Sequence, residues 1–232
     1  MASKIKSSAN NLQVLYEDNH LIVVNKRPGD IVQGDKTGDT PLSDIVKDYL
    51  KTKYNKSGNV FLGVVHRLDR PTSGIVVFAK TSKALPRLNK LFSEGKTKKI
   101  YWAVVNKVPE NKMGTLTHWL VRNPKQNKSY AHKKEVPNSK KAILDYKLIK
   151  KLERYSLLQI DLKTGRHHQI RAQLSAIGSI IKGDLKYGAA RSNKDGSIHL
   201  HSRSLAFEHP VKKEFIEFLA PPPIESVWNA CL

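Results

Sequence analysis

Residues 64–79 of the chain read Val-Val-His-Arg-Leu-Asp-Arg-Pro-Thr-Ser-Gly-Ile-Val-Val-Phe-Ala. Two apolar runs rich in β-branched residues, 64–65 and 75–79, flank a polar segment that contains Asp69. Such runs predict buried strands, and Pro71 and Gly74 predict a turn or loop between them. The carboxylate of Asp69 is therefore expected on a loop held rigidly by two core strands, as a reactive group requires. The alternative is an ordinary strand–loop–strand in which Asp69 caps a turn.

The charge of the chain indicates a polyanionic partner. The 232 residues include 41 Lys and Arg against 20 Asp and Glu, which gives a formal charge of +21. Such a one-sided excess favours nucleic acid. An acidic membrane surface is the second alternative, but no basic amphipathic helix stands apart to support it. We therefore expect a nucleic acid as the partner and no membrane association.

The composition also bears on the compartment. A hydrophobic content of 39% is enough for a folded core, and the single cysteine, Cys231, allows no disulfide within one chain. This favours a reducing compartment. The N-terminus lacks an apolar signal core, and no apolar run is long enough to span a membrane. The sequence predicts a soluble, cytoplasmic protein, which we expect to be a monomer.

Local patterns predict an α+β fold in which strands dominate. Hairpins are expected at residues 14–26, with the turn at 17–20, and at residues 199–219. Helical spacing of apolar residues is found at 44–54 and 82–95, and residues 164–178 are expected to form a turn that runs into a helix. Further strands are expected at 98–105, 142–148 and 155–162, and the basic stretch 113–141 is expected to hold strands with a mobile loop.

The domain organisation is predicted to be simple. Residues 1–11 are mainly Ser, Lys and Asn with little to bury, so we expect a disordered N-terminal tail. No internal repeat or linker is evident after this tail. Residues 12–232 are therefore expected to form one catalytic domain.

Asp69 is the leading candidate for a nucleophile, because carboxylates can act covalently. Covering a carboxylate with a nucleobase desolvates it, and desolvation favours the protonated, inert form. A buried nucleophilic Asp therefore needs a fixed cation, and Arg suits this role because it stays charged and binds carboxylates at two points. We predict Arg171 as this partner. The alternative for Arg171 is a surface contact with phosphate.

Two further residues fit chemistry on a base within RNA. An enzyme that acts on such a base must extrude it and stabilise the gap. The planar guanidinium of Arg67, two residues before Asp69, can stack and hydrogen-bond in that gap. Tyr101, on a predicted strand, can stack on the extruded base. The alternative for Tyr101 is an ordinary core position.

No cofactor or metal site is predicted. His199 and His201 alternate on one strand, and His167 and His168 are adjacent, but no His, Asp or Glu cluster has a recognised metal spacing. Phosphate-loop, dinucleotide-binding and Gly-x-Ser-x-Gly motifs are also missing. We expect a reaction that needs neither metal nor cofactor.

A series of motifs resembles the RluA-type RNA pseudouridine synthases, over nearly the whole chain from about Leu12. The motifs are Glu-Asp-Asn-His-Leu-Ile-Val-Val-Asn-Lys-Arg-Pro-Gly at 17–29, His-Arg-Leu-Asp-x-x-Thr-Ser-Gly at 66–74, Lys-x-Tyr-x-Ala at 99–103, Thr-Gly-Arg-His-His-Gln-Ile-Arg at 164–171, Gly-Asp at 183–184, Tyr-Gly at 187–188, Leu-His at 200–201 and His-Pro at 209–210. The chain departs from the family at His167, where Thr is usual, and at Pro71, where a polar residue is common.

The resemblance implies roles for individual residues. Asp69 would be the nucleophile, Arg171 its ion-pair partner, Tyr101 the aromatic residue over the target base, and Arg67 the residue that replaces the flipped nucleotide. The other motif positions assigned to RNA binding and base flipping are His66, Arg70, Thr72, Lys99, Arg166 and Ile170.

The resemblance also implies the fold and the reaction. The fold would be a central, mostly antiparallel mixed sheet with flanking helices and loops. The reaction would convert uridine to pseudouridine in structured RNA, in ribosomal RNA rather than transfer RNA. An N-terminal S4 domain, common among relatives, is not expected here, so RNA affinity would come from the catalytic domain. Two alternatives remain: a non-catalytic RNA-binding or ribosome-assembly protein on the same fold, and a metal-dependent nuclease or hydrolase that acts on nucleic acid.

Overall fold

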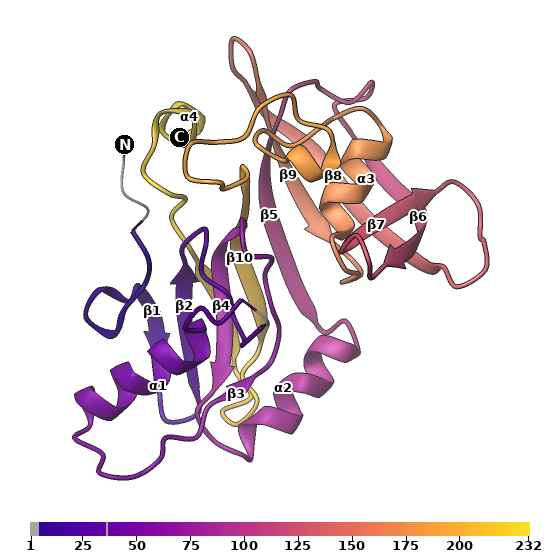
Figure 1. Cartoon of the computed structure of the whole chain (residues 1–232). Coiled ribbons are helices and arrows are strands. Elements are labelled where there is room, and N and C mark those ends of the chain that lie inside the picture. Colours follow the sequence, from indigo (N-terminus) through magenta and orange to yellow (C-terminus); the bar gives the residue numbers. More distant parts are fainter. Residues whose placement is uncertain (1–4, 36) are drawn as a thin grey trace. The chain divides into compact units, whose positions relative to one another are not determined.

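A computed structural model describes residues 5–35 and 37–232 (Figure 1). The chain divides into two units, and the division does not follow the order of the sequence. Unit 1 contains the residues up to Lys98 together with Ser202–Pro223, and unit 2 contains Lys99–His201 together with Ile224–Leu232. The predicted catalytic domain, residues 12–232, extends over both units.

The sheet of unit 1 is built around two strands that are buried along their whole length. These are β2 (Leu21–Lys26) and β4 (Ser73–Ala79), which pair antiparallel. The sheet order is β1, β2, β4, β10. The remaining strands are β1 (Val14–Glu17), β3 (Gly63–Val64), β10 (Leu200–Glu208, whose first two residues lie in unit 2) and β11 (Phe215–Leu219). Both predicted hairpins, β1–β2 and β10–β11, are confirmed.

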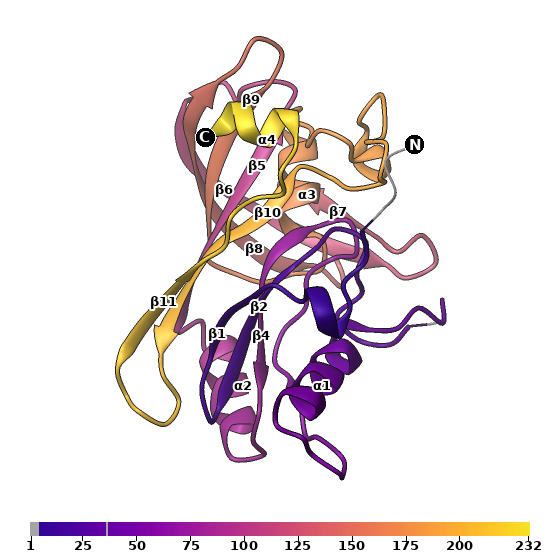
Figure 2. The same cartoon turned by 90° about the vertical axis from the view of Figure 1, so that its left-hand side faces the viewer.

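Two helices cover opposite faces of this sheet (Figure 2). Helix α1 spans Leu42–Lys53 and α2 spans Ala84–Ser93, close to the predicted ranges. Because side chains alternate along a strand, Leu21 and Val23 pack towards α2, whereas Ile22 and Val24 pack towards α1. Each fully buried side chain of this size contributes about 1.5–3 kcal/mol to stability, so burial stabilises β2 and β4.

The N-terminal segment differs from the predicted disordered tail over the residues that are described. Ala9–Asn11 form one 3-10 turn. The hydroxyl of Ser7 donates to Asp30 at 2.6 Å, and the Asn11 side chain accepts from Arg27 at 2.6 Å. These polar contacts, made with residues farther along the chain, hold a segment whose one large apolar side chain, Ile5, is 65% exposed. Residues 1–4 of the predicted tail lie outside the described residues.

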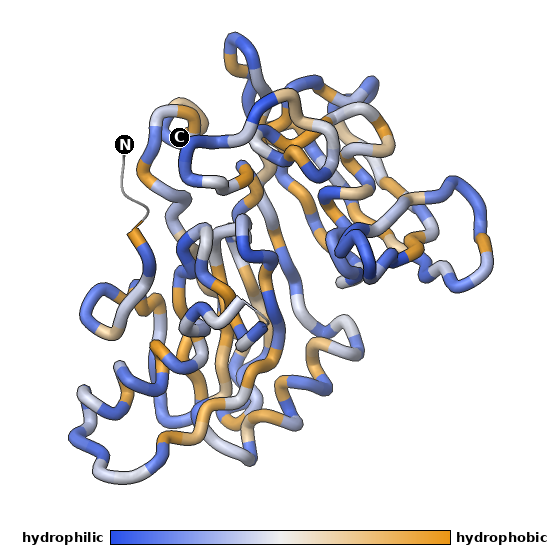
Figure 3. Tube along the Cα trace, viewed as in Figure 1, coloured by the Kyte–Doolittle hydropathy of each residue, from blue (hydrophilic) through white to orange (hydrophobic). Residues whose placement is uncertain are grey.

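Unit 2 contains five strands that pair antiparallel in the order β5, β9, β8, β6, β7. Their bounds are β5 (Thr97–Val105, whose first two residues lie in unit 1), β6 (Met113–Asn123), β7 (Lys128–His132), β8 (Lys140–Lys151) and β9 (Ser156–Leu162). The predicted strands are confirmed. The basic stretch forms the β6–β7 hairpin, followed by the loop 133–139, which is mostly blue in Figure 3.

Helices complete unit 2. Helix α3 (Gln169–Ala176) confirms the helix predicted in this segment. It packs against β6 and β7. The short helix α4 (Ser226–Cys231) was not predicted, because six residues carry little helical signal. Trp228 and Cys231 of α4 are buried with Val104 and Leu157. Among the residues that the structure describes, no helix combines the length and apolar content needed to cross a bilayer.

Candidate active site

Asp69 lies on the loop between β3 and β4, as predicted. These strands pair through Val64 and Phe78, which closes the base of the loop. The amide of Thr72 donates to the Asp69 carbonyl oxygen at 3.0 Å and forms a turn after Asp69. Asp69 itself is half-buried. A carboxylate is thus held at the end of the most deeply buried strand pair of unit 1.

The backbone of this loop is anchored from both sides. Lys26, 1% exposed at the end of β2, donates its ammonium protons to the carbonyl oxygens of Arg27 at 2.9 Å and Arg70 at 3.1 Å. The amide of Gly29 also donates to the Arg70 carbonyl oxygen, at 2.7 Å. A buried ammonium is stable only when its protons are satisfied, so Lys26 fixes the residue that follows Asp69.

His66 anchors the other side of the loop. Its Nε2 accepts from the Val77 amide at 3.1 Å, and its ring stacks on Phe92 of α2 with centroids 4.7 Å apart. The loop is therefore tied to β4 and α2 before Asp69 and to β2 after it. His66, predicted to contact RNA, has a clear structural role in this arrangement.

Gly74, the second residue of the fully buried strand β4, cannot be replaced without strain. Its φ of +111° is outside the range that L-residues favour. A Cβ at this position would lie 2.3 Å from the Ser202 carbonyl oxygen. Close approach of β4 to β10 thus explains why Gly follows Thr-Ser in the loop motif.

The remaining predicted residues of the loop differ in exposure. Arg67 is exposed, as an RNA contact requires. Arg70 pairs with Asp39 at 2.7 Å, so a phosphate would have to compete with this surface ion pair, which is weak. Thr72 is only 2% exposed, and its buried hydroxyl has no hydrogen-bond partner within the described residues. Any effect of Thr72 on RNA binding would therefore act through the conformation of the loop, without direct contact.

In unit 2, Arg171 forms a buried ion pair that sequence reasoning missed. Its Nε and Nη2 donate to the two carboxylate oxygens of Asp184 at 2.7 and 2.9 Å. The Tyr187 ring lies 5.0 Å from the guanidinium carbon. Arg171 is 5% exposed and Asp184 1% exposed, which excludes the surface role weighed for Arg171. The predicted ion pair between Arg171 and Asp69 stays a prediction.

A second network fixes the segment before α3. The Gln169 side chain accepts from the Thr164 hydroxyl at 2.8 Å and the Arg166 amide at 3.0 Å, and it donates to the Ile143 carbonyl oxygen at 3.0 Å. His168 takes a left-handed conformation with φ of 53°. Its Nδ1 lies 3.0 Å from the Tyr187 hydroxyl. Gln169, His168 and Tyr187 thus set the direction in which α3 starts.

Two other residues of this segment were predicted to bind RNA. Arg166 is exposed, and its Nε donates to the Lys141 carbonyl oxygen at 3.1 Å. Ile170 is only 5% exposed and belongs to the core of unit 2. Arg166 is therefore available to a ligand, whereas any role of Ile170 in RNA binding would be indirect.

Tyr101 and Lys99 share the face of the unit 2 sheet against which α3 packs. Tyr101 pairs with Ile160, Ile160 pairs with Tyr146, and Ala142, on the same face as Tyr146, packs with Ala172 of α3. Tyr101 is 8% exposed. Desolvation lowers the pKa of Lys99, and nearby Asp161 opposes this shift.

No group of three or more His, Cys, Asp or Glu suited to a metal ion occurs within residues 5–35 and 37–232. His199 was a candidate metal ligand, but it hydrogen-bonds Glu225 at 2.8 Å and stacks on Trp228 of α4. His201 meets the edge of the same indole ring. These histidines therefore attach the C-terminal helix to unit 2.

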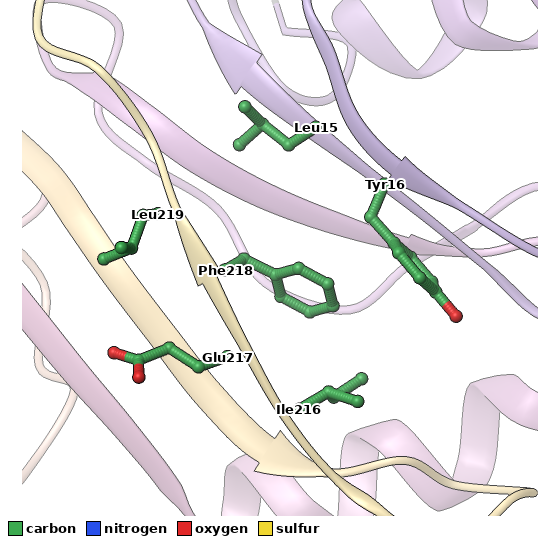
Figure 4. Close-up of a pocket in the computed structure, with 6 residues that line it drawn as sticks. All are labelled: Leu15, Tyr16, Ile216, Glu217, Phe218 and Leu219. Carbon is green, nitrogen blue, oxygen red and sulfur yellow. The ribbon is translucent and has the colours of Figure 1, made fainter.

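A surface hollow of about 310 Å³ lies in unit 1 (Figure 4). Leu15 and Tyr16 of β1 line it together with residues 216–219 of β11. The rings of Tyr16 and Phe218 are 5.2 Å apart. Among the described residues that line the hollow, Glu217 alone carries a formal charge, and its carboxylate makes the hollow unsuited to a polyanion.

Asp184 and Tyr187 are the functional candidates that sequence reasoning did not assign. Asp184 lies in the Gly-Asp motif and Tyr187 in the Tyr-Gly motif, but these motifs do not indicate which residues the two side chains contact. Arg171 precedes Asp184 by 13 residues, and only the fold of the intervening chain brings them together.

The fold and site define an α+β protein that carries a candidate nucleophile on a rigid loop. A model of the RNA pseudouridylate synthase family matches residues 20–176. An uncharacterized RNA pseudouridine synthase of Synechocystis is 32% identical over 216 residues, which cover 91% of this chain and 66% of that protein. The ribosomal large subunit pseudouridine synthase D of Zymomonas mobilis is 31% identical, covering 91% of this chain and 69% of the relative. The chain belongs to the RNA pseudouridine synthase family, whose enzymes are isomerases.

A solved structure supports the fold. Human RNA Pseudouridylate Synthase Domain Containing 4 matches with a TM-score of 0.80 over 96% of this chain and 94% of its own, at 24% identity. The predicted α+β pseudouridine synthase fold is confirmed. The chain spans about two thirds of the length of the two curated relatives named above.

Proposed function

We propose that this protein isomerises uridine to pseudouridine in structured RNA, with Asp69 as the nucleophile. The observation that carries the proposal is the anchoring of the Asp69 loop, by His66 on one side and by Lys26 on the other. A nucleophile held by rigid elements meets its target in a fixed orientation, which lowers the entropic part of the barrier. The family membership of the chain supports the same activity.

The proposed reaction breaks the bond between uracil N1 and the ribose and rejoins the base through C5. C5 loses its hydrogen as a proton, and N1 gains a proton. Asp69 must be ionised for this step, and a base stacked over it removes water. We propose that Arg171 stabilises the ionised form, with Asp184 holding the guanidinium plane in place. Tyr101 is proposed to stack on the extruded uracil, and the exposed Arg67 to occupy the gap in the RNA.

The proposed substrate is ribosomal RNA in preference to transfer RNA. One relative is named for the large ribosomal subunit, which supports this choice. The charge of +21 supports RNA binding by the chain itself. We further propose that the enzyme works in the cytoplasm as a monomer, without metal or cofactor.

The second candidate is a non-catalytic RNA-binding protein of the same family. Such a protein has no need of Asp69, Arg171 or Tyr101, and all three are present. The anchored loop around Asp69 is also a feature that RNA binding alone does not require. These observations favour the enzyme.

Tritium release from RNA labelled at uridine C5 tests the proposal. We expect release by the wild-type protein on large-subunit ribosomal RNA and none above background by Asp69→Asn. Asp44→Asn, on the surface of α1, is the matched control and should react like wild type. Absence of release on ribosomal and transfer RNA, combined with tight RNA binding, would instead support the non-catalytic protein.

A further inference from the structure

The sheet of unit 2 has two faces with different chemistry. One face packs against α3 through Leu120, Ala131 and Ala142. Side chains alternate along strands, so the residues next to these point to the opposite face. We call this opposite side, between β8 and β7, the outer face, and its defining residues are Trp119, Tyr130, His132 and Lys141.

Strand pairing brings the residues of the outer face together. Trp119 of β6 lies between Lys141 of β8 and His132 of β7, with which it pairs directly. Tyr130 pairs with Val121, so it is the diagonal neighbour of Trp119. Diagonal neighbours in antiparallel strands are about 7–8 Å apart, close enough for both rings to engage adjacent groups of one ligand.

These aromatic rings are accessible and have cations beside them. Tyr130 is 41% exposed and Trp119 is half-buried. The Lys128 ammonium lies 5.4 Å from the Tyr130 ring centroid and 5.1 Å from that of Tyr187, at the edge of the sheet formed by β7. The Lys141 ammonium lies 6.0 Å from the Trp119 ring. The Tyr130 hydroxyl donates to Gln126, which fixes the orientation of the ring.

The local charge suits an anionic ligand. Glu135, in the loop after β7, is the only acidic residue from Met113 to Lys141. Asp145 also lies on this face, farther along β8, but Lys163 at 3.2 Å and the Thr115 hydroxyl at 2.6 Å already engage its carboxylate. An accessible aromatic pair with a cation beside each ring is the combination with which proteins bind unpaired nucleotides, since rings stack on bases and cations neutralise phosphates.

We propose that the outer face binds unpaired nucleotides of the RNA substrate, with bases stacked on Trp119 and Tyr130 and phosphates beside Lys128 and Lys141. This inference rests on the proposed function for its choice of RNA. It places a contact on the side of the sheet opposite to α3 and Tyr101, so the RNA segment bound there is not the one that carries the target uridine. Double-stranded RNA does not fit, because its bases are stacked on one another and offer no free ring face.

Binding of a short single-stranded RNA of about ten nucleotides tests the inference. Trp119→Ala and Tyr130→Ala should each weaken binding about 5- to 100-fold, the loss expected for one stacked base. Trp119→Phe and Tyr130→Phe keep a ring and should retain most of the affinity. Phe215→Ala removes an aromatic side chain that is 71% exposed in unit 1 and should bind like wild type.

Two comparisons separate base stacking from a general loss of RNA affinity. Duplex RNA of the same length should bind all these variants equally, whereas an equal loss on duplex and single strand would overturn the inference. On the full RNA substrate, the Ala variants should raise KM and leave kcat unchanged. Unchanged single-strand binding by Trp119→Ala and Tyr130→Ala would also overturn it.

The binding assay requires no isomerisation. If the wild-type protein binds the single strand through these rings and releases no tritium, this result would support the inference and contradict the proposed function. Conversely, tritium release by the wild type, together with unchanged RNA affinity of the Ala variants, would support the proposed function and contradict the inference.

Discussion

The guanidinium of Arg171 and the carboxylate of Asp184 form a two-point ion pair in the interior of the protein, with N–O distances of 2.7 and 2.9 Å. Both side chains are almost fully removed from solvent. Removal of one partner from such a pair leaves a buried charge without compensation. Arg171 is therefore fixed in position by a residue that sequence reasoning did not assign.

Asp184→Asn should destabilise the protein by about 3–5 kcal/mol, because the Arg171 charge stays buried without a carboxylate. Urea unfolding followed by circular dichroism measures this loss. Asp195→Asn, in an exposed turn nearby in the sequence, is the control and should change stability by less than about 1 kcal/mol. A similar stability of Asp184→Asn and wild type would show that the pair contributes little.

Glu17 makes stability depend on pH. Burial alone would raise its pKa, but hydrogen bonds from Lys53, Lys80 and Tyr54 outweigh burial and lower the pKa to about 2. A carboxyl whose pKa is lower in the folded state stabilises the protein above its unfolded value of 4.5, and this contribution is lost as pH falls towards 2. Glu17→Gln should therefore cost about 1–2 kcal/mol at pH 7, after discounting for solvent screening, and almost nothing at pH 2.

Unfolding curves of wild type and Glu17→Gln across this pH range check the prediction. The difference between the two proteins should narrow as pH falls from 4.5 to 2. Glu94→Gln, an exposed partner of Lys96, is a suitable control, since its difference from wild type should stay small throughout. A constant difference for Glu17→Gln would contradict the assignment.

Gly74→Ala should destabilise unit 1 by about 2 kcal/mol or more, because φ is positive and the new Cβ would overlap the Ser202 carbonyl oxygen. Thermal unfolding measures the effect. Gly58→Ala meets no atom within 4 Å and should be close to neutral. Equal melting temperatures of Gly74→Ala and Gly58→Ala would show that the backbone near Gly74 relaxes easily.

Lys125→Glu combined with Lys128→Glu in the β6–β7 hairpin should weaken RNA binding. Each lost phosphate contact should also reduce the slope of log K against log salt by about 0.7–0.9. Titration of RNA at several salt concentrations measures both effects. Lys90→Glu with Lys96→Glu, two cations at the end of α2 that lie near Glu94, provides the matched control. Equal losses in the two double variants would indicate a general charge effect instead of a contact at the hairpin.

Sequence patterns were most informative where the structural signal is local. The β-branched run 75–79 became part of the buried strand β4, and Leu88 with its helical neighbours became the buried face of α2. Glu17–His20 joined β1 to β2 as the turn residues predict. In each case the preference of a few adjacent residues agrees with what the core requires, so local and long-range interactions favour the same structure.

The patterns were less informative where stability comes from partners far along the chain. Ser7 is held by Asp30, which sequence reasoning could not pair with a polar tail. Helix α4 is too short to be stable alone and depends on burial of Trp228 with Val104 and Leu157. Ile170 was assigned to RNA binding from its motif, but its side chain is buried in the core.

The sequence by itself determined the α+β class, the strands on either side of Asp69, the family and the basic character that favours RNA. These properties follow from composition, periodicity and motif order, which are encoded in short segments. Only the tertiary structure decided that Asp184 holds Arg171, that Lys26 and His66 anchor the Asp69 loop, and that Trp119 and Tyr130 share one face. Such relationships depend on strand register and on contacts between distant residues, whose geometry is fixed only when the whole chain packs.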